Sequence, residues 1–171
     1  MGFYQDNLGQ VSSLGVIMRE IKELVVERIH GAREHTVILS DDPNNKLQTP
    51  SDATWYVVTP SPQGNIDMAA VAGGGAAQMT TATRVIVTAH IPYAGDDPNT
   101  IDRYWSLLEK ERLMVLRALS FQMIYDADGN RMLNDVIMPA EWNWNKAAIH
   151  GSVQVAFDIE YDEDISDELT V

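Results

Sequence analysis

Ten consecutive residues near the end of the chain alternate strictly between apolar and other side chains. Residues 152–161 read Ser-Val-Gln-Val-Ala-Phe-Asp-Ile-Glu-Tyr. Successive side chains of an extended chain point to opposite faces, so this stretch is predicted to be a β-strand with one buried face. The apolar face takes Val153, Val155, Phe157, Ile159 and Tyr161. A chain with such a strand must build a sheet that has its core on one side.

The other face of this strand becomes acidic along its length. It carries Asp158 and Glu160, and Asp162 continues the same parity. No Lys or Arg follows Lys146, and the chain has 12 basic and 25 acidic residues, a formal charge of −13. This balance argues against binding nucleic acid through Lys and Arg clusters. A negative face can repel a polyanion or hold a cation, although a charge of this size also simply keeps a protein soluble.

Composition limits the class of protein further. The 171 residues, 45% of them hydrophobic, are expected to form a single domain over 1–171 with a sizeable core. The absence of cysteine excludes disulfides, zinc–thiolate sites and cysteine nucleophiles, and it fits a reducing cytosol. Residues 1–9 lack the features of a signal peptide, and no apolar run approaches the roughly 20 residues that span a bilayer. We therefore expect no membrane association.

Two stretches have the three- and four-residue spacing of amphipathic helices. The first runs from about Ser12 to His30, and Gly31 can end it in a left-handed turn. The second runs from about Thr100, a candidate N-cap, to Leu119. The predicted buried stripes are Leu14, Ile17, Met18, Ile21, Leu24, Val25 and Ile29 in the first helix, and Ile101, Tyr104, Trp105, Leu108, Val115, Leu116 and Leu119 in the second.

Short strands are predicted between and after these helices. They cover residues 37–39, 55–59 and 84–91, and a segment in which Trp142 and Trp144 share one face. Pro60 and Pro62 are expected to stop the second of these strands, because proline cannot donate a hydrogen bond to a ladder.

Residues 63–82 are predicted to be a long flexible loop or a loosely held hairpin. Three consecutive glycines stand in the middle of an alanine-rich run and lose much backbone entropy when they are ordered. A loop this long inside a small domain is usually functional or disordered. We expect it to become ordered only against a neighbour. Its predicted contact residues are Met68, Val71, Gly73, Gly74 and Gly75.

The order of elements is helix, strands, long segment, strand, helix, strands. This order predicts an α+β fold, a mixed, mostly antiparallel sheet with two amphipathic helices packed on one face. No repeat or linker divides the chain, so we expect one domain that ends in an acidic C-terminal tail.

No residue pattern points to catalysis or to a bound metal. A calcium loop that starts at Asp126 would need Gly and Glu where the chain has Arg131 and Ile137, so residues 126–130 are predicted to form a turn. The three glycines lack the Gly-Lys-Ser/Thr of a phosphate loop, and no serine has a nucleophile-elbow setting. The histidines without a metal-ligand spacing are His30, His35, His90 and His150. We expect no enzymatic activity, no cofactor, and no catalytic or metal-binding residue.

The layout from Leu14 onward has a recognisable order. An amphipathic helix precedes Trp-Tyr-Val-Val-Thr-Pro at 55–60, a long loop, Arg-Val-Ile-Val-Thr-Ala at 84–89, a helix from Ile101, and the alternating strand at 153–159. This order resembles the tail terminator, or tail completion, proteins of long-tailed bacteriophages. The resemblance covers most of the chain as an order of elements, and it transfers no invariant site residue.

The resemblance implies a homohexameric ring at the head–tail junction of a virion that is assembled in the host cytoplasm. The ring would cap the tail tube, end its growth, bind a head completion or connector protein, and let DNA pass without specific binding. In such a ring, we expect Asp158, Glu160 and Asp162 to face the channel. We expect Trp142 and Trp144 to lie in an interface, where aromatic residues are enriched.

Other interpretations stay open at this point. A neighbouring head–tail connector or neck protein matches the same order of elements nearly as well. An unrecognised small cytosolic α+β enzyme or ligand-binding protein is a second alternative, and it should have a cleft with convergent polar groups. An acidic adaptor that binds a basic partner through its C-terminal strand is a third.

Overall fold

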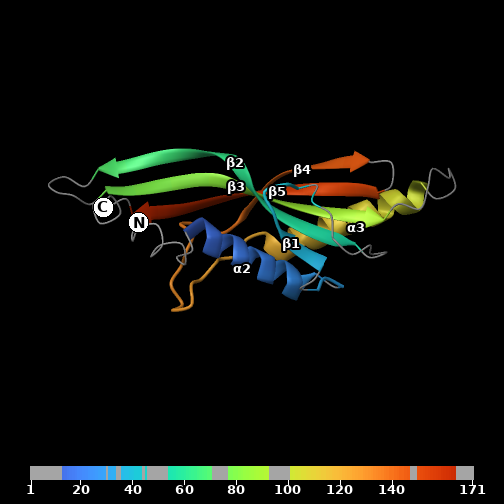
Figure 1. Cartoon of the computed structure of the whole chain (residues 1–171), viewed down its shortest axis with the longest axis horizontal. Coiled ribbons are helices and arrows are strands. Elements are labelled where there is room, and N and C mark those ends of the chain that lie inside the picture. Colours follow the sequence, from blue (N-terminus) through green and yellow to red (C-terminus); the bar gives the residue numbers. More distant parts are fainter. Residues whose placement is uncertain are drawn as a thin grey trace, which may run out of the picture.

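Two helices lie on one face of a five-stranded sheet in the computed structural model of this chain (Figure 1). The structure describes residues 13–29, 31–33, 36–43, 45, 54–70, 77–92, 101–146 and 150–164. The elements in chain order are α2 (Ser13–Arg28), β1 (Val37–Leu39), β2 (Trp55–Ala70), β3 (Ala77–Pro92), α3 (Ile101–Leu119), β4 (Met138–Lys146) and β5 (His150–Asp164). The strand order is β1-β2-β3-β5-β4; β1 runs parallel to β2, and the other pairs are antiparallel. The predicted α+β class is confirmed.

The core lies between the sheet and the two helices, and the alternating strand predicts its position correctly. On β5, Val153 and Phe157 are fully buried, and Ile159 and Tyr161 are 3% exposed. Fully burying a large apolar side chain stabilises a fold by about 1.5–3 kcal/mol. The other main contributors are Val85, Val87, Ala89 and Ile91 of β3, Ile17, Ile21 and Val25 of α2, and Leu108, Val115 and Leu119 of α3.

One described member of the predicted helical stripes is wrong, and the burial of Ile101 stays a prediction because its side chain lies outside the described part. Trp105 was expected in the core and is 51% exposed, whereas Tyr104 is 7% exposed. Adjacent residues of a helix are about 100° apart, so both cannot point at the same part of the sheet. Trp105 falls on the flank of α3 that faces away from the centre of the core.

The prediction that Pro60 and Pro62 stop the second strand is also wrong. β2 continues through both prolines to Ala70, and its register against β3 shifts between Pro60 and Gly64. β1 pairs with β2 only from Tyr56 to Val58, so no described strand lies on the outer side of the two prolines. Proline is tolerated at such an edge and in a bulge, because no ladder hydrogen bond is lost there.

The segment predicted as a loop is largely strand. β2 and β3 pair from Gly64↔Thr83 to Ala70↔Ala77, which is the hairpin alternative rather than the irregular loop. β5 pairs with the same part of β3 from Gln78↔Asp164 to Thr83↔Ile159. We call residues 64–70, 77–83 and 159–164 the arm. It extends past α2 at the left of Figure 1, at the opposite end of the sheet from β4 and the start of α3.

The turn predicted at residues 126–130 is confirmed. Gly129 has a left-handed φ of +84°, and the Asp126 carboxylate accepts hydrogen bonds from the backbone N–H groups of Asp128 (2.9 Å) and Asn130 (2.8 Å). These bonds, from Asn130 first, lower the pKa of Asp126. The carboxylate closes the turn by the usual aspartate geometry, so its polar groups are already used.

We predict that Gly151→Ala destabilises the protein by about 1–3 kcal/mol, the usual cost of overpacking a well-filled contact. A Cβ atom at Gly151 would overlap the hydroxyl oxygen and Cζ of Tyr104, which anchors α3 to β5. Urea unfolding of the wild type, G151A, Y104A and the double variant forms a complete cycle. The double variant should be clearly more stable than the sum of the single changes. Simple additivity would show that the two residues do not limit the approach of α3 to β5.

Candidate functional site

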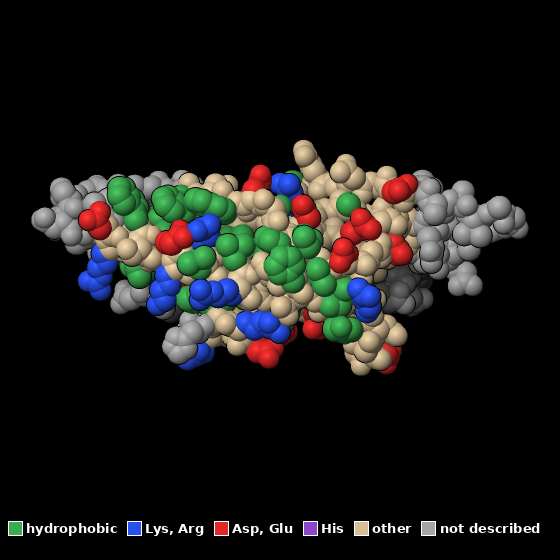
Figure 2. All heavy atoms as spheres, turned by 180° about the vertical axis from the view of Figure 1, so that it is seen from behind, with side chains coloured by type: hydrophobic (Ala, Val, Ile, Leu, Met, Phe, Trp, Pro, Cys, Tyr) green, Lys and Arg blue, Asp and Glu red, His purple; other side chains and the backbone are tan. Residues whose placement is uncertain are grey.

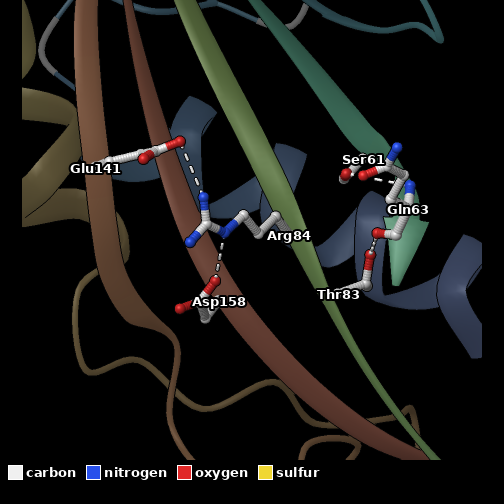
Figure 3. A network of polar contacts seen from close by, with 6 residues as sticks. All are labelled: Ser61, Gln63, Thr83, Arg84, Glu141 and Asp158. Atoms are coloured by element: carbon white, nitrogen blue, oxygen red, sulfur yellow. Dashed lines mark hydrogen bonds and ion pairs between the residues drawn. The ribbon is translucent and has the colours of Figure 1, made fainter. Parts of the chain in front are cut away.

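The sheet face that the helices leave open carries the predicted acidic row, and an arginine interrupts it. Arg84 of β3 donates hydrogen bonds to Asp158 of β5 (2.9 Å) and to Glu141 of β4 (2.9 Å), so it links three adjacent strands (Figure 3). Arg84 and Asp158 are also direct cross-strand partners. These side chains are 42–66% exposed, so each ion pair contributes at most about 1 kcal/mol. Because Arg84 is shared with Glu141, it compensates the charge of Asp158 only in part.

Glu160 and Asp162 lie further along the same strand and are held by neutral groups. The Asn134 side-chain amide donates to Glu160 (3.1 Å) and to Asp162 (2.8 Å), and Thr80 donates to Asp162 (2.7 Å). Hydrogen bonds from Asn134 and Thr80 lower the pKa of Asp162. Among the described residues, no Lys or Arg forms an ion pair with either carboxylate. The uncompensated part of the predicted acidic row thus consists of Glu160 and Asp162, on the arm.

Trp142 and Trp144 lie on the helix side of β4. They stand opposite Val155 and Val153, whose side chains are in the core, and directly paired residues share a face of the sheet. Each tryptophan is nevertheless 45% exposed. Their rings pack against each other at 5.3 Å, and the Arg112 guanidinium lies 4.5 Å from the centre of the Trp142 ring. Their role in an interface stays a prediction.

A shallow apolar groove runs beside these rings, between β4 and the exposed flank of α3. We call it the tryptophan groove; its apolar lining is Trp105, Leu113, Met114 and Trp144, and its basic lining is Lys110 and Arg117. Asp102 and Glu109 also line it, and Glu109 is paired with Arg112. Figure 2 shows hydrophobic and basic side chains mixed on the half of the molecule that contains this groove, whereas acidic side chains gather toward the other half.

One ionisable pair lies inside the protein. The Tyr56 hydroxyl donates a hydrogen bond to Glu111 Oε2 (2.6 Å), and the two residues are 2% and 8% exposed. Burial raises the pKa of Glu111, and the hydrogen bond from Tyr56 offsets part of that rise. Burial and the neighbouring carboxylate also raise the pKa of Tyr56. The pair joins α3 to β2 within the core, and neither residue lines the tryptophan groove.

The remaining predicted contact residues are only partly placed. Met68 lies in β2 opposite Met79 of β3, within the arm. Val71, Gly73, Gly74 and Gly75 lie outside the described residues, so the predicted mobility of this segment stays a prediction.

No described residues form a recognisable reaction centre. In the part of the chain that the structure describes, no three His, Asp or Glu side chains come together as a metal site would require. His90 is buried in β3; its ring stacks on Trp55, and its Nε2 donates to the Pro43 carbonyl oxygen (2.8 Å). A second wide, open hollow lies near the β2 bulge, and the charged groups that line it include Arg84 and Asp158, which pair with each other. None of the described helices is long and apolar enough to cross a membrane.

Sequence reasoning missed Arg84, Trp105 and the basic side of α3. The parity of β3 indicates that Arg84 faces away from Val85, but the register that brings it to Asp158 and Glu141 is a tertiary property. Lys110 and Arg117 look like ordinary solvent-facing helix residues until β4 is placed beside them.

Comparisons with known proteins assign no family. No protein-family model matches the chain, and no curated protein matches it. Among solved structures, the chain is similar to a chain of the "Virion of native gene transfer agent (GTA) particle", at 12% sequence identity and a TM-score of 0.44, covering 94% of this chain and 91% of that chain. A likeness this distant does not establish what the present chain does.

We predict that Glu111→Gln stabilises the protein at neutral pH and that this gain shrinks as the pH falls toward 4.5, the ordinary pKa of the group. A carboxyl group whose pKa is raised by folding binds its proton more tightly in the folded state. The protonated carboxyl therefore contributes stability below the unfolded pKa, and this contribution is lost as pH rises through the folded pKa. Gln keeps an acceptor for Tyr56 and carries no charge.

The measurement is the difference in free energy of unfolding between E111Q and the wild type, from urea titrations between pH 4 and 8. Glu109→Gln is the matched control, because Arg112 lowers the pKa of the exposed Glu109 and the pH trend should reverse. A difference for E111Q that does not change with pH would contradict the assignment of Glu111 as a buried, destabilised carboxylate.

Proposed function

We propose that this chain is a structural protein of a phage-type virion, and that it forms a homo-oligomeric ring at the head–tail junction. The observation that carries the proposal is the group of half-exposed tryptophans, Trp105, Trp142 and Trp144, beside the outer edge of β4, with which no described strand pairs. Exposed aromatic residues beside a strand edge promote aggregation of a monomer, whereas in an assembly they can be buried in an interface between subunits. The proposed role is mechanical and includes no catalytic step.

The fold supplies two different sides for such a ring. The helices cover one face of the sheet (Figure 1). On the other face, Asp158 and Glu160 are exposed, whereas Val57, Thr88 and His90 are buried. We place the open face toward the central channel and the helices outside. The order of elements along the chain, which resembles tail terminator proteins, supports the same role. One end of the ring would fit the tube and the other would not, so tube growth would stop there.

The acidic residues of the open face suit a channel for DNA. Glu160 and Asp162 would repeat in every subunit and form a negative girdle. Salt screens exposed charges over about 8–10 Å, so the girdle would act on DNA that is already inside the ring. Asp158 contributes less than the sequence suggests, because Arg84 compensates part of its charge. Repulsion of this kind keeps phosphates from adhering while the genome moves.

The direct test of the proposal is particle assembly with and without this chain. Without it, we expect tail tubes of abnormal length that are not joined to heads, and supplying the chain should restore both properties. Tails of normal length that fail to join heads would indicate a neck or connector protein instead. Complete, infectious particles made without the chain would contradict the proposal.

We predict that Trp142→Ala combined with Trp144→Ala weakens self-association by about 30-fold or more. Replacing a tryptophan that is buried in an interface with Ala often costs about 2 kcal/mol or more of binding free energy. The free energy of unfolding should fall by about 1 kcal/mol or less, since both rings are only half buried. Sedimentation and thermal unfolding measure the two effects separately. Phe121→Ala is a matched control, because Phe121 is 63% exposed and is not part of the groove lining. Loss of folding without a specific loss of association would place both rings in the ordinary core.

We predict that Glu160→Lys combined with Asp162→Lys permits folding and ring formation but slows DNA ejection from assembled particles. The control is Glu20→Lys with Glu23→Lys, which makes the same charge change at exposed positions of α2. Ejection rates are measured on purified particles of equal DNA content. Normal ejection by the particles with lysines on β5 would show that this face does not line the channel.

A further inference from the structure

We propose that the tryptophan groove receives the arm of a second copy of this chain, so that the copies join head to tail. The inference rests on the proposed ring and goes further by naming the two surfaces that meet. The edge strand of the arm, β2 from Gly64 to Ala70, would lie along α3 beside β4, with Ile66 against the tryptophans.

The groove has the length and chemistry for such a strand. From Asp102 to Arg117, α3 spans about 22 Å at 1.5 Å per residue. From Gly64 to Ala70, an extended strand spans about 20 Å at 3.3 Å per residue. The floor is apolar through Trp105, Leu113 and Trp144, and β4 beside it is the last strand of the sheet, so its outer backbone groups can pair with an added strand.

The arm has the complementary properties. Ile66 is 64% exposed on β2, although most other large aliphatic side chains of the described strands are buried. Beyond Val58, no described strand pairs with the outer edge of β2. The arm contains no Lys or Arg; the acidic residue on its edge strand is Asp67, whereas Glu160 and Asp162 belong to β5, two strands away from that edge. An edge strand with exposed Asp67 and Ile66 matches a groove that has Lys110 and Arg117 beside its tryptophans.

Charge identifies a second copy as the occupant. The chain carries −13 overall, yet α3 has a small positive net charge, because it holds four basic residues (Arg103, Lys110, Arg112 and Arg117) and three acidic ones (Asp102, Glu109 and Glu111). Because Arg112 pairs with Glu109, Lys110 and Arg117 are opposed in the groove only by Asp102, and this small positive excess favours an acidic partner such as the chain's own arm. The arm of the same molecule cannot fill its own groove, because the two lie at opposite ends of the sheet (Figure 1). Contacts between two different surfaces are heterologous, and such contacts generate rings when the rotation closes.

Reciprocal charge reversal tests this contact. One variant carries Lys110→Glu and Arg117→Glu in the groove, and the other carries Asn65→Lys and Asp67→Lys on the arm. All four positions are exposed. Each variant alone should associate about tenfold more weakly than the wild type, or worse, because groove and arm then repel. An equimolar mixture should associate again, since each groove then meets an arm of opposite charge.

The size of the assemblies is measured on the purified full-length chains by sedimentation and by mass measurement. We expect mixed assemblies with equal numbers of the two variants, and a chain with all four changes should also associate. Two control variants repeat the charge changes on α2, Arg19→Glu with Arg28→Glu and Glu20→Lys with Glu23→Lys, and these should associate normally. Ile66→Asn should weaken association without a change of charge.

Several results would overturn the inference. The wild type could remain monomeric at the highest concentration reached, the mixture could fail to associate, or the arm variant could associate as well as the wild type. If the mixture associates in solution but complete particles form without the chain, this contact is supported and the virion role is contradicted. If particles require the chain but the mixture of variants does not associate, the virion role is supported and this contact is contradicted.

Discussion

The structure depends on the pairing of β3 with β5, which continues without a break from Pro92↔His150 to Gln78↔Asp164. Every second side chain of β5 along most of this ladder enters the core. The helices cover only part of its length, and the strands therefore extend beyond them as the arm (Figure 1). Without the long ladder, the hairpin of β2 and β3 would have little to hold it, because an isolated two-stranded hairpin is marginally stable in water. The pairing of β3 with β5 thus supports both the core and the arm.

Sequence periodicity predicted those parts of the fold that burial controls. The stripes of α2 and α3 and the alternation of β5 follow directly from which side chains must leave water. The predictions are wrong where the tertiary structure overrides a local sequence rule. Pro60 and Pro62 would break an inner strand, but β1 is too short to reach them, so they lie at an edge. Trp105 fits the apolar spacing of its helix, yet it falls on the flank of α3 that faces away from the centre of the core and is 51% exposed.

The candidate site was less predictable for the same reason. Trp142 and Trp144 could be assigned to one face, but their half-exposed state depends on how far α3 reaches toward the edge of the sheet. The acidic row was visible in the sequence, whereas its compensation by Arg84 requires three strands in register. The basic lining of the groove comes from α3, and its tryptophans come from α3 and β4. No periodicity within one segment can reveal a surface that two segments share.

The arm and the groove carry charges of opposite sign at opposite ends of the sheet, which favours head-to-tail contacts between copies. The charged residues of the arm are all acidic, and the groove at the other end of the sheet has a small positive excess because Arg112 pairs with Glu109, so contact between unlike ends is attractive and contact between like ends is repulsive. Isologous dimers, which bring identical surfaces together, are disfavoured at both places. Strands of a sheet are also rotated relative to one another by their twist, so the arm is not aligned with β4. Successive copies joined arm to groove would therefore be related by a rotation and not by a translation alone. Repeated rotation of one sign gives a closed ring when a whole number of copies completes one turn without a rise along the axis, and an open helix otherwise, so the angle of the arm–groove contact decides between the two.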